Sequence, residues 1–174
     1  PFEDATVVVI DAIGEWETIT IWHAYYDNKG RACYQKLWKQ RYPHSIGLYY
    51  SAMTARLGLR PLDEEYIMMG MAGWGHPEGK DLIESEFVHD LATLKFKQNL
   101  HAGIDKNFLI NMTDYDIAAS AQYSVERMID NVMSRARGFN KSSNLVYMGG
   151  VALNCLYNRK LGNFFDNIWI MPNP

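Results

Sequence analysis

The amino-acid sequence predicts an α/β protein in which a mixed sheet, three antiparallel strands and then βα units, carries helices on its faces. Two observations lead to this prediction. Strand-like apolar patterns dominate the first forty residues, and apolar residues then recur at helical spacing in several later segments. Between residues 113 and 171 the patterns alternate as helix, strand, helix and strand, which is typical of βα units.

Three strand-like segments open the chain. Residues 6–11 form a nearly continuous run of β-branched side chains, which is typical of a strand buried on both faces of a sheet. Residues 18–22 alternate between polar and apolar side chains, and residues 31–38 also have a strand-like composition. The turn-forming residues 27–30 lie between these two segments and predict a hairpin.

Helical spacing follows the strands. Apolar residues recur every three or four positions over residues 45–57, and Gly58 is typical of the position just beyond a helix end. Residues 63–71 begin with three acids, which the positive end of a helix dipole favours. We also expect a helix over residues 81–91 and a short strand over residues 93–97.

The clearest helix covers residues 114–137. Thr113 and Asp116 resemble a capping box at its start, and Gly138 is expected to end it. Its apolar stripe consists of Ile117, Ala121, Val125, Met128, Ile129, Val132 and Met133. A strand over residues 144–148, a helix over residues 151–161 and a strand over residues 167–171 complete the expected order.

The composition is that of one ordinary globular domain. Of the 174 residues, 48% are hydrophobic and 21% are charged, which excludes a disordered or fibrous protein. The net charge of −3 disfavours a basic nucleic-acid surface, and no apolar run approaches the ~18 residues that span a membrane. Cys33 and Cys155 match no zinc spacing and are expected to be free thiols in the cytoplasm.

The first candidate site is the turn after the first strand. Asp11 ends a strand that is expected to be buried, so its carboxylate could orient Mg²⁺ or the waters of a metal-bound phosphate. Gly14 would allow close approach of the backbone, and Thr18 could donate a hydrogen bond to a phosphate oxygen. An ordinary hairpin with an aspartate in its turn is the alternative.

The second candidate site is the passage from strand 144–148 into the following helix. Gly149 and Gly150 have no side chains, so a ligand could approach the exposed N–H groups at the helix start. Asn154 would lie about one turn further on, where it could bind a ribose or a base. A tight structural turn is the alternative. The pattern is not G-x-G-x-x-G, and no P-loop is present, so a Rossmann fold is not expected.

Four sequence blocks occur in a specific order: DAIGEW at 11–16, PHSIGLYY at 43–50, EYIMMGMA at 65–72 and GGVALNC at 149–155. Together they resemble the NodU/CmcH-type O-carbamoyltransferases, in the part related to the tRNA threonylcarbamoyl-transfer protein TsaD. This family belongs to the actin/hexokinase/heat-shock ATPase superfamily. The resemblance implies that residues 1–174 form one ribonuclease H-like lobe of the actin-like ATPase fold.

The resemblance also implies a function. In such enzymes a YrdC-like domain makes carbamoyl-adenylate from carbamoyl phosphate and ATP, and the TsaD-like domain passes the carbamoyl group to a hydroxyl-bearing small molecule. Matching positions imply a nucleotide-binding role, and no role as a catalytic base, for nine residues. They are Asp11, Gly14, Glu15, Thr18, Gly47, Glu65, Gly149, Gly150 and Asn154.

The chain departs from the family at several points. The family usually has glycine at Ala12 and lysine at Ile67. Its site for iron or magnesium uses a His-rich motif that would precede Pro1 and an aspartate that would follow Pro174. The five histidines show no metal-binding spacing. We therefore expect a fragment that lacks the first lobe and the YrdC-like domain, is inactive alone and binds metal only in the full-length protein.

Two alternatives remain open from the sequence. A sugar-kinase-like phosphotransferase of the same superfamily would share the phosphate and adenosine motifs but release ADP rather than AMP. A non-catalytic lobe that binds a nucleotide or a partner would need its other half in trans. An apolar face left exposed where the first lobe docks would favour a homodimer.

Overall fold

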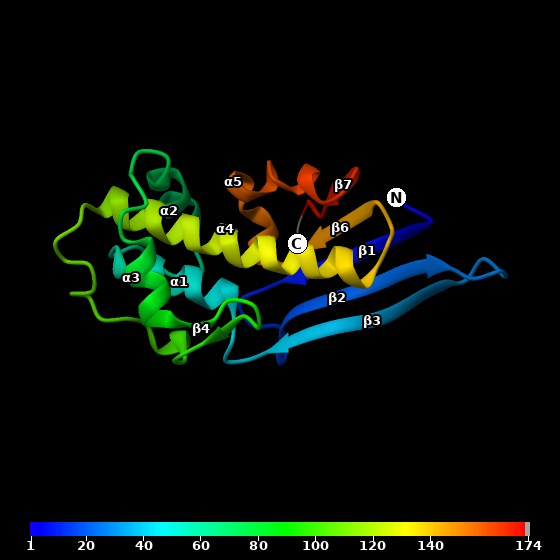
Figure 1. The fold of residues 1–174 in the computed structure, drawn as a ribbon, viewed down its shortest axis with the longest axis horizontal. Helices are drawn as coiled ribbons and strands as arrows, with labels where there is room; N and C mark the ends of the chain where they lie inside the picture. The colour runs from blue at the N-terminus through cyan, green and yellow to red at the C-terminus, as the bar shows by residue number, and fades with distance from the viewer. Residues whose placement is uncertain (173–174) are drawn as a thin grey trace.

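A five-stranded mixed sheet forms the centre of the computed structural model, which describes residues 1–172 (Figure 1). The strand order is β3-β2-β1-β6-β7. The strands are β1 (Asp4–Ile10), β2 (Glu17–Tyr26), β3 (Ala32–Arg41), β6 (Asn144–Met148) and β7 (Asn167–Ile170). The pairs β1–β2 and β2–β3 are antiparallel. The pairs β1–β6 and β6–β7 are parallel. The predicted fold class is confirmed.

Helices pack beside this sheet, and the long helix α4 crosses it (Figure 1). The α-helices are α1 (Ile46–Arg56), α2 (Glu65–Ala72), α3 (Lys80–Phe87), α4 (Asp114–Phe139) and α5 (Cys155–Asn158). A small hairpin of β4 (Val88–Asp90) and β5 (Lys95–Phe96) and the 3₁₀ turns η1 (Leu100–Ala102), η2 (Gly150–Leu153) and η3 (Leu161–Asn163) complete the fold. Within residues 1–172, no helix has both the length and the apolar character needed to cross a membrane.

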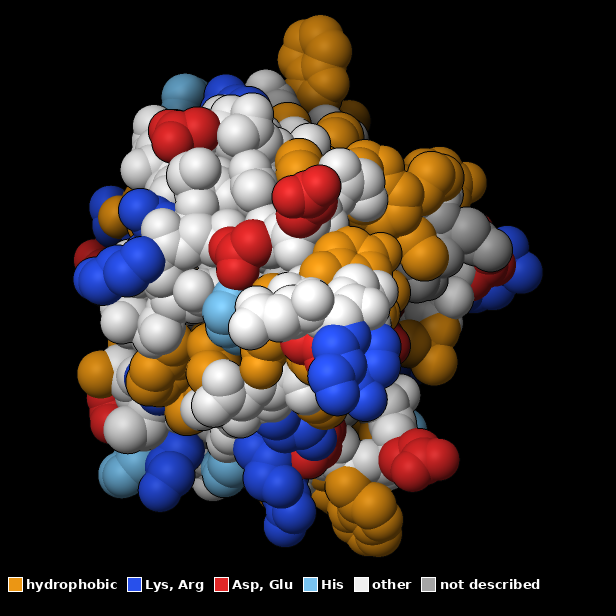
Figure 2. Space-filling model, turned by 90° about the vertical axis from the view of Figure 1, so that its right-hand side faces the viewer, with side chains coloured by type: hydrophobic (Ala, Val, Ile, Leu, Met, Phe, Trp, Pro, Cys, Tyr) orange, Lys and Arg blue, Asp and Glu red, His pale blue; other side chains and the backbone are white. Residues whose placement is uncertain are grey.

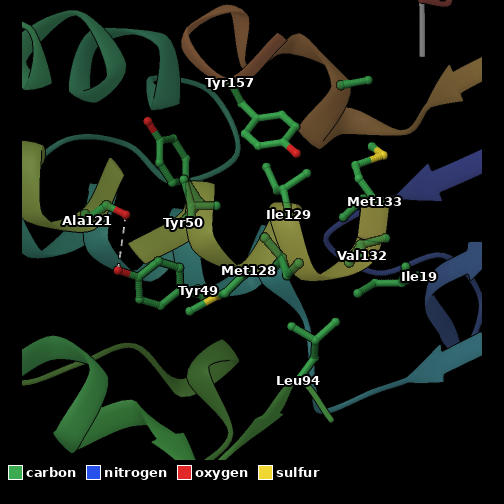
Figure 3. Close-up of a cluster of buried hydrophobic side chains, with 14 of the residues drawn as sticks. Ile19, Tyr49, Tyr50, Leu94, Ala121, Met128, Ile129, Val132, Met133 and Tyr157 are labelled. Carbon is green, nitrogen blue, oxygen red and sulfur yellow. Dashed lines mark hydrogen bonds between the residues drawn. The ribbon is translucent and has the colours of Figure 1, made fainter. Parts of the chain in front are cut away.

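The core lies between α4 and one face of the sheet (Figure 3). All seven residues of the predicted α4 stripe are buried. Val8 and Ile10 of β1 are fully buried on this face, and Ile19 and Ile21 of β2 lie beside them. Because side chains alternate along a strand, Val7 and Val9 point to the other face.

The other face of the sheet is only partly covered. Val7 and Val9 are partly buried there, and they line an apolar groove with Trp22, Val146 and Met148. Figure 2 views the molecule from the end that carries the tip of the β2–β3 hairpin, and apolar side chains gather along one side of that view. The prediction that the first strand is buried on both faces is therefore right for the helix-covered face only.

Several helix predictions differ from the structure. The segment predicted as one helix over residues 151–161 is η2, α5 and η3, because Asn154 has non-helical angles (φ −72°, ψ 86°) and its side chain caps α5. Gly138 does not end α4, which continues to Phe139. The helix predicted over 81–91 ends at Phe87, because the next residues pair with β5.

His44 links the β4–β5 hairpin to the segment before α1. Its Nδ1 accepts a hydrogen bond from the Phe96 N–H at 3.2 Å, and its carbonyl accepts one from the Thr18 hydroxyl at 2.6 Å. Burial lowers the pKa of His44, and the positive charges of Lys95 and His89 lower it further. The folded protein therefore disfavours the protonated ring, which could not accept this bond at Nδ1.

Below pH 6.5, the ordinary pKa of histidine, we expect the free energy of unfolding to decrease as the pH is lowered. The unfolded chain then binds more protons at this site, so the stabilisation is complete above pH 6.5 and is lost as the pH falls through the lower folded pKa of His44. Urea unfolding between pH 5.0 and 7.5 measures this change. His44→Asn keeps an acceptor near the Nδ1 position without titrating, and it should flatten the slope. Equal slopes for the two proteins would contradict the role of His44.

Candidate functional site

A cleft of about 320 Å³ lies where the end of β1 meets α1, α2 and η2. It is lined by Asp11, Ala12, Gly47, Tyr50, Ser51, Leu62, Asp63, Glu65, Tyr66, Met69, Val125, Gly150, Val151, Leu153 and Asn154. Five of the nine residues predicted for the site are therefore brought together from four separate parts of the chain. The cleft has polar groups at the end of β1 and apolar side chains along α2 and η2.

The carboxylate of Asp11 stands at the polar end, one residue beyond the last residue of β1. The Asp11 N–H donates to the Thr18 carbonyl at 2.9 Å, which continues the β1–β2 pairing and holds the residue in place. Asp11 Oδ1 accepts from the Ala12 N–H at 2.8 Å. A Cβ built on Gly150 would be 3.5 Å from this oxygen, so the glycine turn and the carboxylate face each other across a short gap.

Helix α1 is anchored directly to the Asp11 turn. The hydroxyl of its N-cap residue, Ser45, donates to the carbonyls of Asp11 and Ala12 and accepts from the Leu48 N–H. A Cβ on Gly47 would lie 2.6 Å from the Ala12 Cα. Glycine at position 47 therefore allows the first turn of α1 to approach the β1 end this closely.

The carboxylate of Glu65 supports the opposite wall. Its Oε1 accepts from the Ser51 hydroxyl and from the Leu62 N–H, each at 2.6 Å. Leu62 has a positive φ of 65°, which is uncommon for a residue with a branched side chain. Glu65 thus ties α1 to the start of α2 and holds Leu62 in this conformation at the cleft.

Gly149 lies behind the cleft and supports the glycine turn. It has a φ of +89°, and a Cβ there would be 2.2 Å from the Ile10 carbonyl oxygen. Glycine is required on both grounds, because other residues disfavour this φ and no side chain fits against β1. The turn from β6 into η2 is therefore pressed against the end of β1.

Asn154 closes the cleft through a buried polar network. Its amide exchanges two hydrogen bonds of 3.0 Å with the amide of Gln122 on α4. The Tyr50 hydroxyl donates to Gln122 Oε1 at 2.8 Å, and Gln122 Nε2 donates to Glu126 at 2.9 Å. Burial raises the pKa of Tyr50, so its hydroxyl stays protonated and remains a donor at neutral pH.

Sequence reasoning missed Tyr50 and Gln122. Tyr50 lies within the apolar pattern of α1 and gives no sign of a polar role. Gln122 offered a signal: it is a polar residue on the predicted helix 114–137, next to Ala121 of the apolar stripe. A buried glutamine needs partners for its amide, and such partners often lie in a site or a specific network.

The remaining predicted residues do not line the cleft. Gly14 and Glu15 lie in the exposed β1–β2 turn. Thr18 is buried, and its hydroxyl donates to the His44 carbonyl at 2.6 Å. Ile67 is partly buried on α2 and is not among the lining residues, so the departure from the family's lysine lies outside this cleft.

A metal site made by protein side chains alone does not fit the described residues. Among residues 1–172, no group of three or more His, Cys, Asp and Glu side chains could hold a metal ion together. Mg²⁺ in phosphate sites needs only one or two carboxylates, because phosphate oxygens and water complete its coordination. Asp11 is the carboxylate that could serve at the polar end of the cleft, and residues 1–172 do not by themselves supply an iron site with several histidines.

Comparisons with known sequences give one family model and several relatives. The family model "Carbamoyltransferase N-terminus" matches residues 1–174. An uncharacterised protein of Synechocystis sp. is 32% identical over 195 residues, covering 99% of this chain and 31% of that protein. The nodulation protein NolO of Bradyrhizobium diazoefficiens is 28% identical over 141 residues, covering 74% and 26% respectively. The chain thus spans less than a third of the length of these curated relatives.

A solved structure agrees with the fold. The activator of the 2-hydroxyisocaproyl-CoA dehydratase from Clostridium difficile superposes with a TM-score of 0.52 and 16% identity. The superposition covers 99% of this chain and 55% of that chain. At this identity the likeness concerns the fold alone, which is the actin-like ATPase fold.

Proposed function

The chain belongs to the carbamoyltransferase N-terminal family, and from this premise we propose that it is the nucleotide-binding lobe of an ATP-dependent O-carbamoyltransferase. The intact enzyme would move a carbamoyl group from carbamoyl-adenylate to a hydroxyl of a small molecule. A YrdC-like domain that uses carbamoyl phosphate, and the first lobe of the actin-like fold, are part of this proposal. Both would belong to the full-length protein.

The cleft is the observation on which the proposal rests. A nucleotide has a negatively charged end, which Mg²⁺ held by Asp11 could join to the cleft, and a flat, largely apolar base, which the apolar side chains of the walls could contact. Asp11, Gly47 and Gly150 meet at its polar end, and Tyr66 and Leu153 are among the apolar side chains of its walls. The structural neighbour from Clostridium difficile was solved with bound ADPNP, which supports a nucleotide in this fold.

Carbamoyl transfer from carbamoyl-adenylate suits a lobe that binds and orients the substrate and supplies no reacting group. Carbamoyl-adenylate is a mixed anhydride, so the protein has to hold it, exclude water and orient its carbonyl. The acceptor oxygen forms a bond to the carbamoyl carbon, the bond from that carbon to the phosphate oxygen breaks, and AMP leaves with the electron pair. The hydroxyl proton passes to solvent. Within residues 1–172 we assign binding and orientation, but no catalytic base.

The nucleotide product tests this proposal. The full-length protein is incubated with ATP, carbamoyl phosphate and a panel of hydroxyl-bearing acceptors, and the products are separated by ion-exchange chromatography. We expect AMP and pyrophosphate to form from ATP, and inorganic phosphate from carbamoyl phosphate, together with a carbamoylated acceptor. ADP with a phosphorylated acceptor would instead indicate a phosphotransferase of the same fold. Absence of nucleotide turnover and of nucleotide binding would favour a non-catalytic lobe.

A further inference from the structure

We propose that Gln122 and Tyr50 are positioning residues of the nucleotide cleft, which act by fixing the amide of Asn154 and with it the η2 turn. This inference rests on the proposed function. It also changes the role of Asn154, which the sequence suggested as a direct contact of a ribose or base. The amide is instead used mainly to attach the turn to α4.

The orientation of both amides is determined by their surroundings. Glu126 accepts from Gln122 Nε2 at 2.9 Å, and its other oxygen pairs with Lys160 Nζ at 2.6 Å. A carboxylate paired in this way only accepts, so the NH₂ group of Gln122 must face it and the oxygen must face the other way. The Tyr50 hydroxyl donates to that oxygen. A flipped Gln122 would place its oxygen against the carboxylate of Glu126.

The orientation of Gln122 in turn fixes Asn154. Gln122 Nε2 donates to Asn154 Oδ1, and Asn154 Nδ2 donates back to Gln122 Oε1. The Tyr157 N–H also donates to Asn154 Oδ1 at 3.0 Å, which agrees with the same orientation. Both lone pairs of Asn154 Oδ1 and one of the two N–H groups of its amide are therefore hydrogen-bonded within the protein.

The position of the turn follows from these bonds. Gly149 presses one end of the turn against the Ile10 carbonyl, and Asn154 fastens the other end to α4. Gly150 and Leu153 between them line the cleft, and Gly150 faces Asp11. Loss of the amide pair would release one end of the turn, so the groups of η2 that line the cleft would no longer be held in one position.

Two adjacent tyrosines of α1 provide a matched test. Tyr50 donates to Gln122, whereas the Tyr49 hydroxyl donates to the Ala121 carbonyl at 3.4 Å, and Tyr49 does not line the cleft (Figure 3). Tyr50→Phe and Tyr49→Phe each remove one buried hydroxyl that contacts α4. A merely structural role would make the two variants alike in ADPNP affinity.

The affinity of this cleft for ADPNP is measured by calorimetry of the full-length protein, with the ATP site of the YrdC-like domain fitted as a separate site. We expect Tyr50→Phe to weaken binding about fivefold and Tyr49→Phe to leave it within about twofold. Gln122→Met should weaken it at least about tenfold, and adding Tyr50→Phe to Gln122→Met should cost nothing further, because both act through one amide. Thermal unfolding checks that each variant folds. If Gln122→Met does not fold, equal affinities of the two tyrosine variants would still overturn the positioning role.

The results that would overturn the positioning role differ from the result that would overturn the proposed function. Equal affinities for the two tyrosine variants would overturn the positioning role while leaving nucleotide binding intact. Additive losses in the double variant would mean that Tyr50 contacts the ligand independently of Gln122, which also overturns it. Absence of ADPNP binding by the unsubstituted protein would overturn the proposed function itself, and this inference with it.

Discussion

Replacement of Gly149 by alanine is expected to lower the free energy of unfolding by about 3 kcal/mol or more. Two unfavourable contributions to the free energy of folding add at position 149. The φ of +89° is unfavourable for any residue with a Cβ, and that Cβ would lie 2.2 Å from the Ile10 oxygen and 2.7 Å from the Ile10 carbonyl carbon. Backbone atoms of a central strand cannot move aside cheaply, so the turn and η2 would have to shift away from β1.

Urea unfolding of the chain measures this effect, and Gly138→Ala provides the control. Gly138 lies within α4, where a Cβ would meet nothing within 4 Å. Alanine there should be neutral or stabilise by up to about 1 kcal/mol, because alanine favours helices more than glycine does. Equal stability of the Gly149→Ala variant and the unsubstituted protein would contradict the close packing of the turn on β1.

Replacement of Asp11 by asparagine is expected to slow carbamoyl transfer by the full-length protein about a hundredfold or more. Asparagine keeps an oxygen that can accept from the Ala12 N–H, so the turn should persist. The negative charge at the polar end of the cleft is lost. Mg²⁺ that accompanies phosphates depends on such a charge, and Asp11 is the carboxylate that would hold it.

Steady-state rates of carbamoylated product formation measure the effect, and Asp63→Asn is the matched control. Asp63 also lines the cleft, but it pairs with Arg60 at 2.8 Å and is well exposed. Its loss should change the rate by no more than about twofold, because exposed ion pairs contribute little. A rate for Asp11→Asn that equals the rate of the unsubstituted protein would remove Asp11 from the site.

The regular elements could be predicted because their patterns are local. β1 was recognisable from its β-branched run, and the 114–137 helix from a stripe that the structure buries completely. The break at Asn154 was not recognisable, because residues 151–161 have an apolar pattern that suits a continuous helix. The hydrogen bond that the Tyr157 N–H donates to Asn154 Oδ1, and the amide pair of Asn154 with Gln122, break the helix there.

The candidate site was predictable only in part, for a similar reason. Asp11, Gly149 and Gly150 stand at strand ends, and strand ends at the same edge of a sheet meet in space. The partnership of Tyr50 with Gln122 joins residues 72 positions apart in the sequence, and no local pattern announces it. Thr18 could be placed near the site, but its bond to the His44 carbonyl depends on how the loop before α1 folds.

The most direct test of the central claim is a crystal structure of the full-length protein with ADPNP. We expect nucleotide density in the cleft, with the phosphates at Asp11 and Gly150 and the base along the apolar side chains of α2 and η2. Nucleotide bound only elsewhere in the protein, with this cleft filled by protein or solvent, would contradict the assignment of residues 1–174 as the nucleotide-binding lobe.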